Sequence, residues 1–253
     1  MPVLELQDAN PEIDFQDLAR CLFEAHESSP QNFLQILFPI HDSANGDDAS
    51  HKVAREAAIS NAGERLKNWH AHEPTSHWQK VVDVETGKLV GGASWNIFKT
   101  NPFADPFGHE LEVTWFPDNA AARCFAERAL ENYGMPRYEV AQRPHMYLMN
   151  IFTYPEFRQQ GVAQRILDWG VSKADELGLD IFLDATLPSK TLFEKNGFVE
   201  IKKNVISPQA DDVDDVKWKE MEQKVGILTY LLMWRPFGGK YEEGKTTKPW
   251  EVE

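Results

Sequence analysis

The stretch from residue 146 to residue 178 constrains the fold of this chain most. Met146 to Thr153 is nearly all apolar, as expected of a strand that is buried in the middle of a sheet. Pro155 ends that strand. From Gly161 to Leu177 apolar residues recur at helical spacing, and Gly178 is placed to end the helix. The pattern predicts a central strand, a short turn and an amphipathic helix.

The turn has the sequence Arg158-Gln159-Gln160-Gly161-Val162-Ala163. A helix N-terminus presents unpaired N–H groups and a partial positive charge, so it attracts phosphates. Gly161 lacks a Cβ, so a diphosphate can approach its backbone, and Ala163 is small. The amides from Gln159 to Gln164 are therefore predicted to bind a diphosphate. A glycine at an ordinary strand–helix turn gives the same pattern, so the turn alone does not decide.

The flanking segments predict further strands and helices. Upstream, we expect a strand, two helices and a hairpin, over residues 3–6, 14–26, 51–72 and 78–98. Downstream, we expect strands over 180–185, 198–206 and 227–234, a short helix over 189–196, and an exposed loop or short helix over 210–222. Residues 101–143 interrupt the strand series and are predicted to be an insertion, with a helix over 119–132. The tail from Gly238 is predicted to be poorly ordered.

Composition limits the classes of function. The chain has 253 residues, enough for one substantial core, and a formal net charge of −14. That charge argues against nucleic-acid and anionic-membrane partners. The absence of a secretory signal, of an apolar run of about 18 residues and of a cysteine framework predicts a cytoplasmic protein. His70 and His72 lie two apart, so they are not on one helix face, and we expect no metal.

A second motif, Leu192-Phe193-Glu194-Lys195-Asn196-Gly197-Phe198, follows the next strand. Together with Pro155 and the turn beginning at Arg158, it resembles the GNAT superfamily of acyl-CoA-dependent N-acyltransferases, whose motif A is Gln/Arg-x-x-Gly-x-Gly/Ala. The phrase Asp168-Trp169-Gly170 is similar to fungal members of unassigned substrate. The resemblance implies an α+β fold, an α/β sandwich. Its central mixed sheet of about seven strands is splayed open between residues 146–153 and 180–185. It also implies one domain over 1–237, with the 101–143 insertion, and a tail over 238–253.

The resemblance further implies acetyl-CoA as co-substrate and an amine as acceptor. The pantetheine arm is expected along one strand, the pyrophosphate on the turn amides, and Phe193 near the thiol. The implied cofactor-binding residues are Ile151, Phe152, Thr153, Arg158, Gln159, Gln160, Gly161, Val162, Ala163, Gln164 and Phe193.

Two positions depart from the family pattern. The tyrosine that protonates the leaving thiolate in the family corresponds to Phe193, and an asparagine in the preceding loop corresponds to Thr186. Tyr147 and Tyr154 are alternative acids, although packing or loop anchoring also explains them. The candidate catalytic residues are therefore Asp184 as general base, Glu112 in the insertion, where it could line an amine pocket, and Tyr154.

The leading hypothesis is transfer of an acetyl group from acetyl-CoA to a primary amine, in a small molecule rather than a protein. Attack is direct, in a ternary complex. Two alternatives stay open: a non-catalytic acyl-CoA binder or sensor, motivated by Phe193, and O-acetylation of a hydroxyl metabolite. A monomer and a homodimer are both compatible with the sequence.

Overall fold

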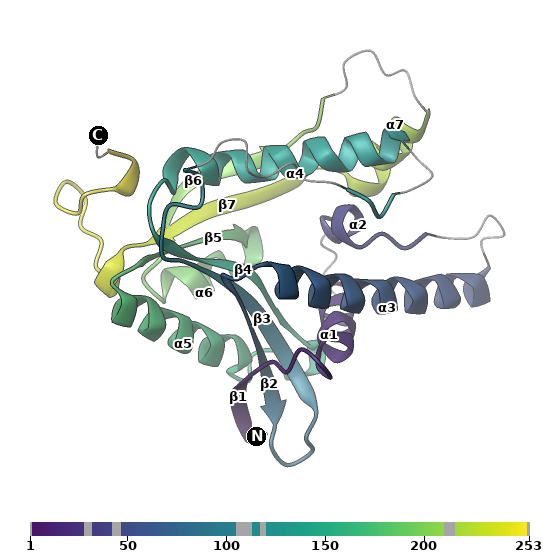
Figure 1. The fold of residues 1–253 in the computed structure, drawn as a ribbon, viewed down its shortest axis with the longest axis horizontal. Coiled ribbons are helices and arrows are strands. Elements are labelled where there is room, and N and C mark those ends of the chain that lie inside the picture. Colours follow the sequence, from purple (N-terminus) through teal and green to yellow (C-terminus); the bar gives the residue numbers. More distant parts are fainter. Residues whose placement is uncertain are drawn as a thin grey trace. The chain divides into compact units, whose positions relative to one another are not determined.

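The computed structural model describes residues 2–27, 32–41, 47–104, 113–116, 120–209 and 216–251. Seven strands form one mixed sheet in the order β1-β2-β3-β4-β5-β7-β6 (Figure 1). The strands are β1 (Leu4–Asp8), β2 (Ser76–Asp83), β3 (Leu89–Phe98), β4 (His145–Thr153), β5 (Asp180–Thr186), β6 (Val199–Ile206) and β7 (Leu228–Arg235). The predicted α+β class and the number of strands are confirmed.

Helices flank the sheet. The α-helices are α1 (Phe15–Glu27), α2 (Leu34–Leu37), α3 (Asp48–His72), α4 (Ala120–Val140), α5 (Val162–Leu177), α6 (Lys190–Glu194) and α7 (Val216–Val225). Four short 3-10 turns are η1 (Pro155–Phe157), η2 (Leu187–Ser189), η3 (Phe237–Gly239) and η4 (Pro249–Glu251). None of the described helices is both long and apolar enough to cross a membrane.

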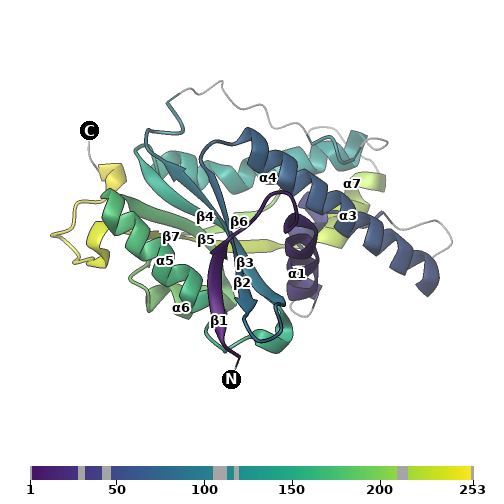
Figure 2. The ribbon, with the colours of Figure 1, turned by 60° about the horizontal axis from the view of Figure 1, so that its bottom comes forward.

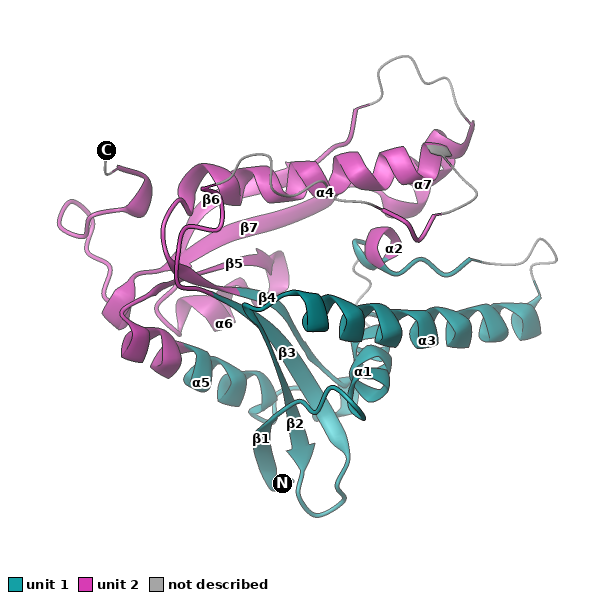
Figure 3. Ribbon diagram, in the orientation of Figure 1, with its two compact units in different colours: residues 1–34, 38–97, 148–170 teal, residues 35–37, 98–147, 171–253 magenta. Residues whose placement is uncertain are grey.

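The chain divides into two compact units (Figure 3). Unit 1 comprises residues 1–34, 38–97 and 148–170, and unit 2 comprises 35–37, 98–147 and 171–253. β4 contributes its first three residues to unit 2 and the rest to unit 1. The single-domain boundaries of 1–237 stay a prediction.

In unit 1, β1, β2 and β3 form an antiparallel meander, visible in both views of the ribbon (Figures 1 and 2). The predicted hairpin is confirmed, with Gly87 at φ 70° in its turn. That left-handed conformation favours glycine.

Two consecutive glycines of β3 let helices approach both faces of this strand. A Cβ on Gly91 would lie 2.5 Å from Cγ1 of Val162, the first residue of α5. A Cβ on Gly92 would lie 2.5 Å from Cδ2 of Leu18 in α1. Successive side chains point to opposite faces of a strand, so α5 and α1 pack on opposite sides here.

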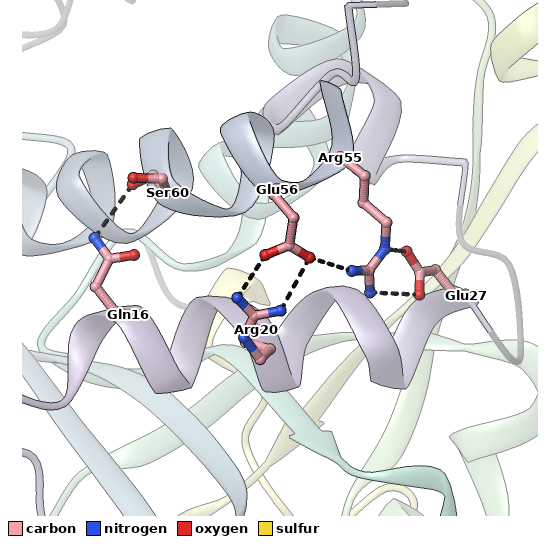
Figure 4. A network of polar contacts seen from close by, with 6 residues as sticks. All are labelled: Gln16, Arg20, Glu27, Arg55, Glu56 and Ser60. Carbon is pink, nitrogen blue, oxygen red and sulfur yellow. Dashed lines mark hydrogen bonds and ion pairs between the residues drawn. The ribbon is translucent and has the colours of Figure 1, made fainter. Parts of the chain in front are cut away.

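Polar contacts join α1 to α3 (Figure 4). Arg20 makes a bidentate pair with Glu56 at 3.1 and 2.7 Å, and Arg55 of α3 reaches both Glu56 and Glu27. Gln16 donates to the Ser60 carbonyl at 3.3 Å. Exposed pairs of this kind each contribute about 1 kcal/mol or less, so the network aligns two helices whose apolar faces supply most of the packing energy.

Unit 2 contains the antiparallel ladder of β5, β7 and β6. Helix α4 lies along β6 and beside α7 (Figure 1). The predicted end of this helix at Asn132 is wrong, because α4 continues through Pro136 to Val140. Proline has no N–H to give the carbonyl four residues earlier. The Asn132 carbonyl instead accepts a hydrogen bond from Nδ2 of Asn204, in β6, at 3.3 Å.

Of two other segments of unit 2, the first differs from expectation and the second agrees with it. The tail after Gly238 was predicted to be poorly ordered, but Tyr241 and Trp250 pack edge-on against Trp234, with ring centroids 5.9 and 5.3 Å away. Aromatic burial fixes this segment. Part of the predicted loop or short helix over 210–222 is α7, which buries Trp218; residues 210–215 lie outside the described part.

Gly170 of α5 offers a test of packing in unit 1. A Cβ at Gly170 would meet the ring of Trp95, which is fully buried and donates to Oε1 of Gln79. We expect Gly170→Ala to lower the free energy of unfolding by about 1 to 3 kcal/mol, measured by urea denaturation. Gly134→Ala in α4 is the matched control, since no atom lies within 4 Å of its Cβ position. It should be neutral or stabilise the protein by up to about 1 kcal/mol. Equal effects of the two substitutions would contradict the packing assignment.

Candidate functional site

The turn between β4 and α5 lies in unit 1 and contains two residues with positive φ. After η1 the backbone passes through Gln159 at φ 58° and Gly161 at φ 89°. Arg165 N–H then donates to the Gly161 carbonyl at 3.1 Å, the first hydrogen bond of the helix. Left-handed residues next to a helix N-terminus orient successive amides in one direction, as in phosphate-binding nests.

The space beside the Cα of Gly161 is open. A Cβ built on Gly161 would meet no atom within 4 Å, and the residue is exposed. A side chain at Gly161 would therefore project into open space. Val162 is buried against β3, which fixes the helix start, and Ala163 is half-buried. This geometry agrees with the predicted role of the turn, although the binding itself stays a prediction.

The side chains around the turn are held by contacts within unit 1. Arg158 donates a hydrogen bond from one guanidinium nitrogen to the Ala25 carbonyl near the end of α1, and its predicted contact with a phosphate stays a prediction. A guanidinium is favourable at a helix C-terminus. Gln160 donates to the Glu156 carbonyl at 2.7 Å, and Gln164 donates to Asp168 at 2.7 Å. The Arg158 and Gln160 contacts thus brace the turn, and the Gln164 contact lies within α5.

The second half of β4 leads into this turn. Burial of the whole strand was predicted, but Met149 is 42% exposed, and Asn150, Ile151 and Thr153 are half-buried. Phe152 alone among the last five residues is fully buried. This half of the strand therefore has accessible surface where the pantetheine arm is predicted to bind. An exposed methionine within an apolar run gave no signal in the sequence.

Tyr154 anchors the end of β4. Its N–H donates to the Val90 carbonyl at 3.0 Å, and the Lys88 ammonium lies 4.7 Å from the centre of its ring. Burial and nearby carboxylates raise the pKa of Tyr154 above its usual range. These contacts fit a loop-anchoring role, and its catalytic role stays a prediction.

A buried polar cluster occupies unit 2 around Asp184. Asp184 lies opposite Leu232 in the β5–β7 ladder, and its Oδ2 accepts a hydrogen bond from the Tyr147 hydroxyl at 2.5 Å. The Tyr133 hydroxyl lies 3.1 Å from that of Tyr147. The Arg137 guanidinium carbon sits 3.9 Å from the centre of the Tyr147 ring. β4, α4 and β5 thus place four polar groups together.

Burial raises the pKa of Asp184, while hydrogen bonds from Tyr147 and Tyr133 and the positive charge of Arg137 act to lower this pKa. Burial and the Asp184 charge also raise the pKa of both Tyr147 and Tyr133. A carboxyl with a raised pKa and hydroxyl partners can exchange a proton closer to neutral pH than an ordinary aspartate.

Tyr133 and Arg137 were missed by sequence reasoning, because they follow the predicted end of the helix at Asn132. They are four residues apart, so they lie on one face of α4 once the helix continues through Pro136. That spacing was the available signal.

Other candidate residues have different surroundings. Phe193 is buried and packs edge-on against Phe198, and the Thr186 hydroxyl pairs with that of Ser189 at 3.0 Å. Glu112 lies outside the described residues. No group of three metal-ligating side chains is present among the residues that the structure describes. Trp95 and Trp234 are fully buried, and Trp115 donates to the Ile36 carbonyl at 2.7 Å.

The profile of the Acetyltransferase (GNAT) family matches residues 40–198, well over half of the chain, and the protein belongs to this family. Two solved structures share the fold. One is histone acetyltransferase HPA2 and related acetyltransferase from Corynebacterium glutamicum, with 19% identity, a TM-score of 0.51, and coverage of 96% of this chain and 99% of the other. The second is the C-terminal condensation domain of Ebony in complex with beta-alanyl-dopamine, with 11% identity, a TM-score of 0.55, and coverage of 93% and 99%. No curated protein sequence gave a significant match.

His145, at the start of β4, is a fully buried histidine in the aromatic core of unit 2. Its Nδ1 lies 2.7 Å from the Arg143 carbonyl, an acceptor, so Nδ1 carries the proton. The rings of Phe98 and Phe182 lie 5.1 and 5.2 Å from the imidazole. Burial lowers the pKa of His145 from 6.5 to about 4. The native state therefore holds the imidazole neutral.

Neutral His145 predicts a loss of stability in acid. Because the unfolded chain binds this proton at a higher pH than the folded protein, stability falls as pH drops from 6.5 through 4, by about 3 kcal/mol in total. His145→Gln removes the titrating group, so its free energy of unfolding should fall less between pH 7 and pH 4.5 than that of the wild type. The exposed His72→Gln is the control. Parallel curves for His145→Gln and the wild type would contradict the prediction.

Proposed function

We propose that this protein transfers an acetyl group from acetyl-CoA to the primary amine of a small molecule. The single observation that supports this most is the open backbone at Gly161, at the N-terminus of α5. The amides from Gln159 to Gln164 would bind the pyrophosphate. The pantetheine arm would run along Ile151, Phe152 and Thr153, where β4 keeps accessible surface.

In the proposed reaction the amine nitrogen attacks the acetyl carbonyl carbon, the C–N bond forms and the C–S bond breaks. Asp184 first takes one proton from the substrate ammonium as general base, and a strand N–H polarises the carbonyl. After the neutral amine has attacked, the second N–H proton passes to solvent as the C–S bond breaks. The thiolate leaves without help from Phe193, which has no proton to give. A thiol with a reference pKa of about 8.5 is a fair leaving group, and solvent or Tyr154 would protonate it. Glu112 stays a candidate for the wall of an amine pocket.

The charge of the chain supports an amine acceptor. A net charge of −14 favours cationic over anionic molecules near the surface.

Both cysteines, Cys21 and Cys124, are free thiols, which supports a reducing, cytoplasmic location.

A second function is supported by one observation. Phe193 replaces the tyrosine of the family motif and is packed against Phe198. A family member without that hydroxyl can act as an acyl-CoA binder or sensor that does not turn over.

The Gly161 backbone gives a direct test of the cofactor site. We expect Gly161→Glu to abolish CoA binding in isothermal titration calorimetry, because the side chain fills the open space and its charge repels the diphosphate. Gly87→Glu is a matched control: φ is 70°, and no atom lies near its Cβ position, but it sits in the β2–β3 turn. It carries similar backbone strain and should bind CoA normally. Normal binding by Gly161→Glu would refute this site.

The enzymatic proposal is tested by release of free thiol from acetyl-CoA across a panel of aliphatic amines, aromatic amines and diamines. We expect amine-dependent release by the wild type and none by Gly161→Glu, with N-acetylated product identified by mass spectrometry. CoA binding without release across the panel would favour the binder. An ester product would indicate O-acetylation.

A further inference from the structure

Three side chains from three elements of unit 2 form a continuous line of oxygen atoms. Tyr133 of α4 meets Tyr147 of β4 at 3.1 Å between hydroxyls, and Tyr147 meets Oδ2 of Asp184 in β5 at 2.5 Å. Tyr147 is fully buried, while Tyr133 and Asp184 are half-buried. A buried phenol hydroxyl usually has one hydrogen-bond partner. Packing alone does not require two phenol hydroxyls to be hydrogen-bonded in series to the same carboxyl.

We propose that Tyr147 and Tyr133 are positioning residues that hold Asp184 and exchange hydrogen bonds with it in both of its protonation states. The inference rests on the proposed function for its use, since Asp184 is the proposed base. It assigns roles to two hydroxyls that the proposed chemistry had left unused.

The argument depends on the two-way chemistry of a hydroxyl, which both donates and accepts. While Asp184 is ionised, the Tyr147 hydroxyl donates to Oδ2 and accepts from Tyr133. When Asp184 takes a proton from the substrate ammonium, one N–H bond breaks and one O–H bond forms. The new Oδ2–H then donates to Tyr147, and the Tyr147 hydrogen turns to the Tyr133 oxygen. The Tyr133 hydrogen turns from Tyr147 to the Asp184 carboxyl, with which Tyr133 also forms a hydrogen bond. The Asp184 carboxyl thus keeps a hydrogen-bond partner in both protonation states, and losing that partner would be costly.

Every neighbouring element contributes to this environment. Arg137, one turn along α4 from Tyr133, places its guanidinium 3.9 Å from the centre of the Tyr147 ring and so fixes that ring by a cation–π contact. Tyr230 of β7 packs edge-on against Tyr133 at 5.6 Å. The charged and titratable groups facing Asp184 are therefore Arg137, Tyr133, Tyr147 and Tyr230.

The test measures Asp184 directly in the full-length protein. Carboxyl carbons are labelled with 13C-aspartate, the Asp184 signal is assigned by its loss in Asp184→Asn, and its pH titration is followed by NMR. We expect Tyr147→Phe to raise the pKa of Asp184 by about 1 to 2, because the ionised carboxylate loses one hydrogen bond. Tyr133→Phe should raise the pKa by less. Tyr138→Phe, on the exposed part of the same helix, should leave the pKa unchanged.

An unchanged Asp184 pKa in both Tyr147→Phe and Tyr133→Phe overturns the inference. If Tyr147→Phe fails to fold, Tyr133→Phe decides alone. Tyr133 is half-buried, and the proposed hydrogen bonds require its loss to raise the pKa of Asp184 measurably.

Activity with an amine from the panel separates the inference from the proposed function. A base must be ionised, so kcat/KM should rise with pH through the Asp184 pKa, and this rise should move to higher pH in Tyr147→Phe by the same amount as the NMR titration. If the NMR titration moves and the rate profile does not, the hydroxyl chain stands and Asp184 is not the base. If the NMR titration does not move, the inference fails whatever the rates.

Discussion

The close approach of two helices to one strand is the constraint on which unit 1 depends. At Gly91 and Gly92 the strand β3 has no side chains, and Val162 and Leu18 fill the two faces. Any other residue at either position would displace α5 or α1. The N-terminus of α5 is therefore fixed against the sheet, and the amides that follow Arg158 are held beside the end of β4. Arg158 completes the arrangement through its hydrogen bond to Ala25 at the end of α1. The same packing that stabilises the unit also shapes the proposed cofactor site.

The strand–turn–helix unit was predictable because its signals are local. The apolar run of β4, Pro155, Gly161 and the helical periodicity of α5 all lie within about thirty residues along the chain, and turn chemistry depends mainly on neighbouring residues. Gly91 and Gly92 carried no comparable signal. A glycine pair within a strand predicts only weaker packing, and its partners, Val162 and Leu18, lie some seventy residues away on either side. The role of Gly91 and Gly92, to admit the two helices, depends on packing between segments far apart in the sequence.

The polar cluster in unit 2 was only half predictable for the same reason. Asp184 stood out as an acidic residue at the end of an apolar strand. Tyr133 and Arg137 were hidden behind Pro136, which by local rules ends or kinks a helix. The helix continues because Asn204, seventy-two residues further along, donates to the carbonyl that Pro136 leaves without an N–H partner. The sequence pattern of α4 contains no trace of that compensation.

The substitution at Phe193 bears on how the chemistry is divided among the residues. Phe193 has packed its ring against Phe198, so the lost hydroxyl is replaced there by apolar contact, not by another polar group. The thiolate can leave without a protein acid, because the pKa of a thiol, about 8.5, lies near neutral pH. In the proposed reaction the acceptor amine does need help, since an amine with a pKa of about 10 is almost wholly protonated at pH 7 and cannot attack until it loses a proton. The burden of proton transfer therefore falls on the base. A carboxyl whose pKa is raised by burial, and whose hydrogen bonds survive protonation, is suited to that task.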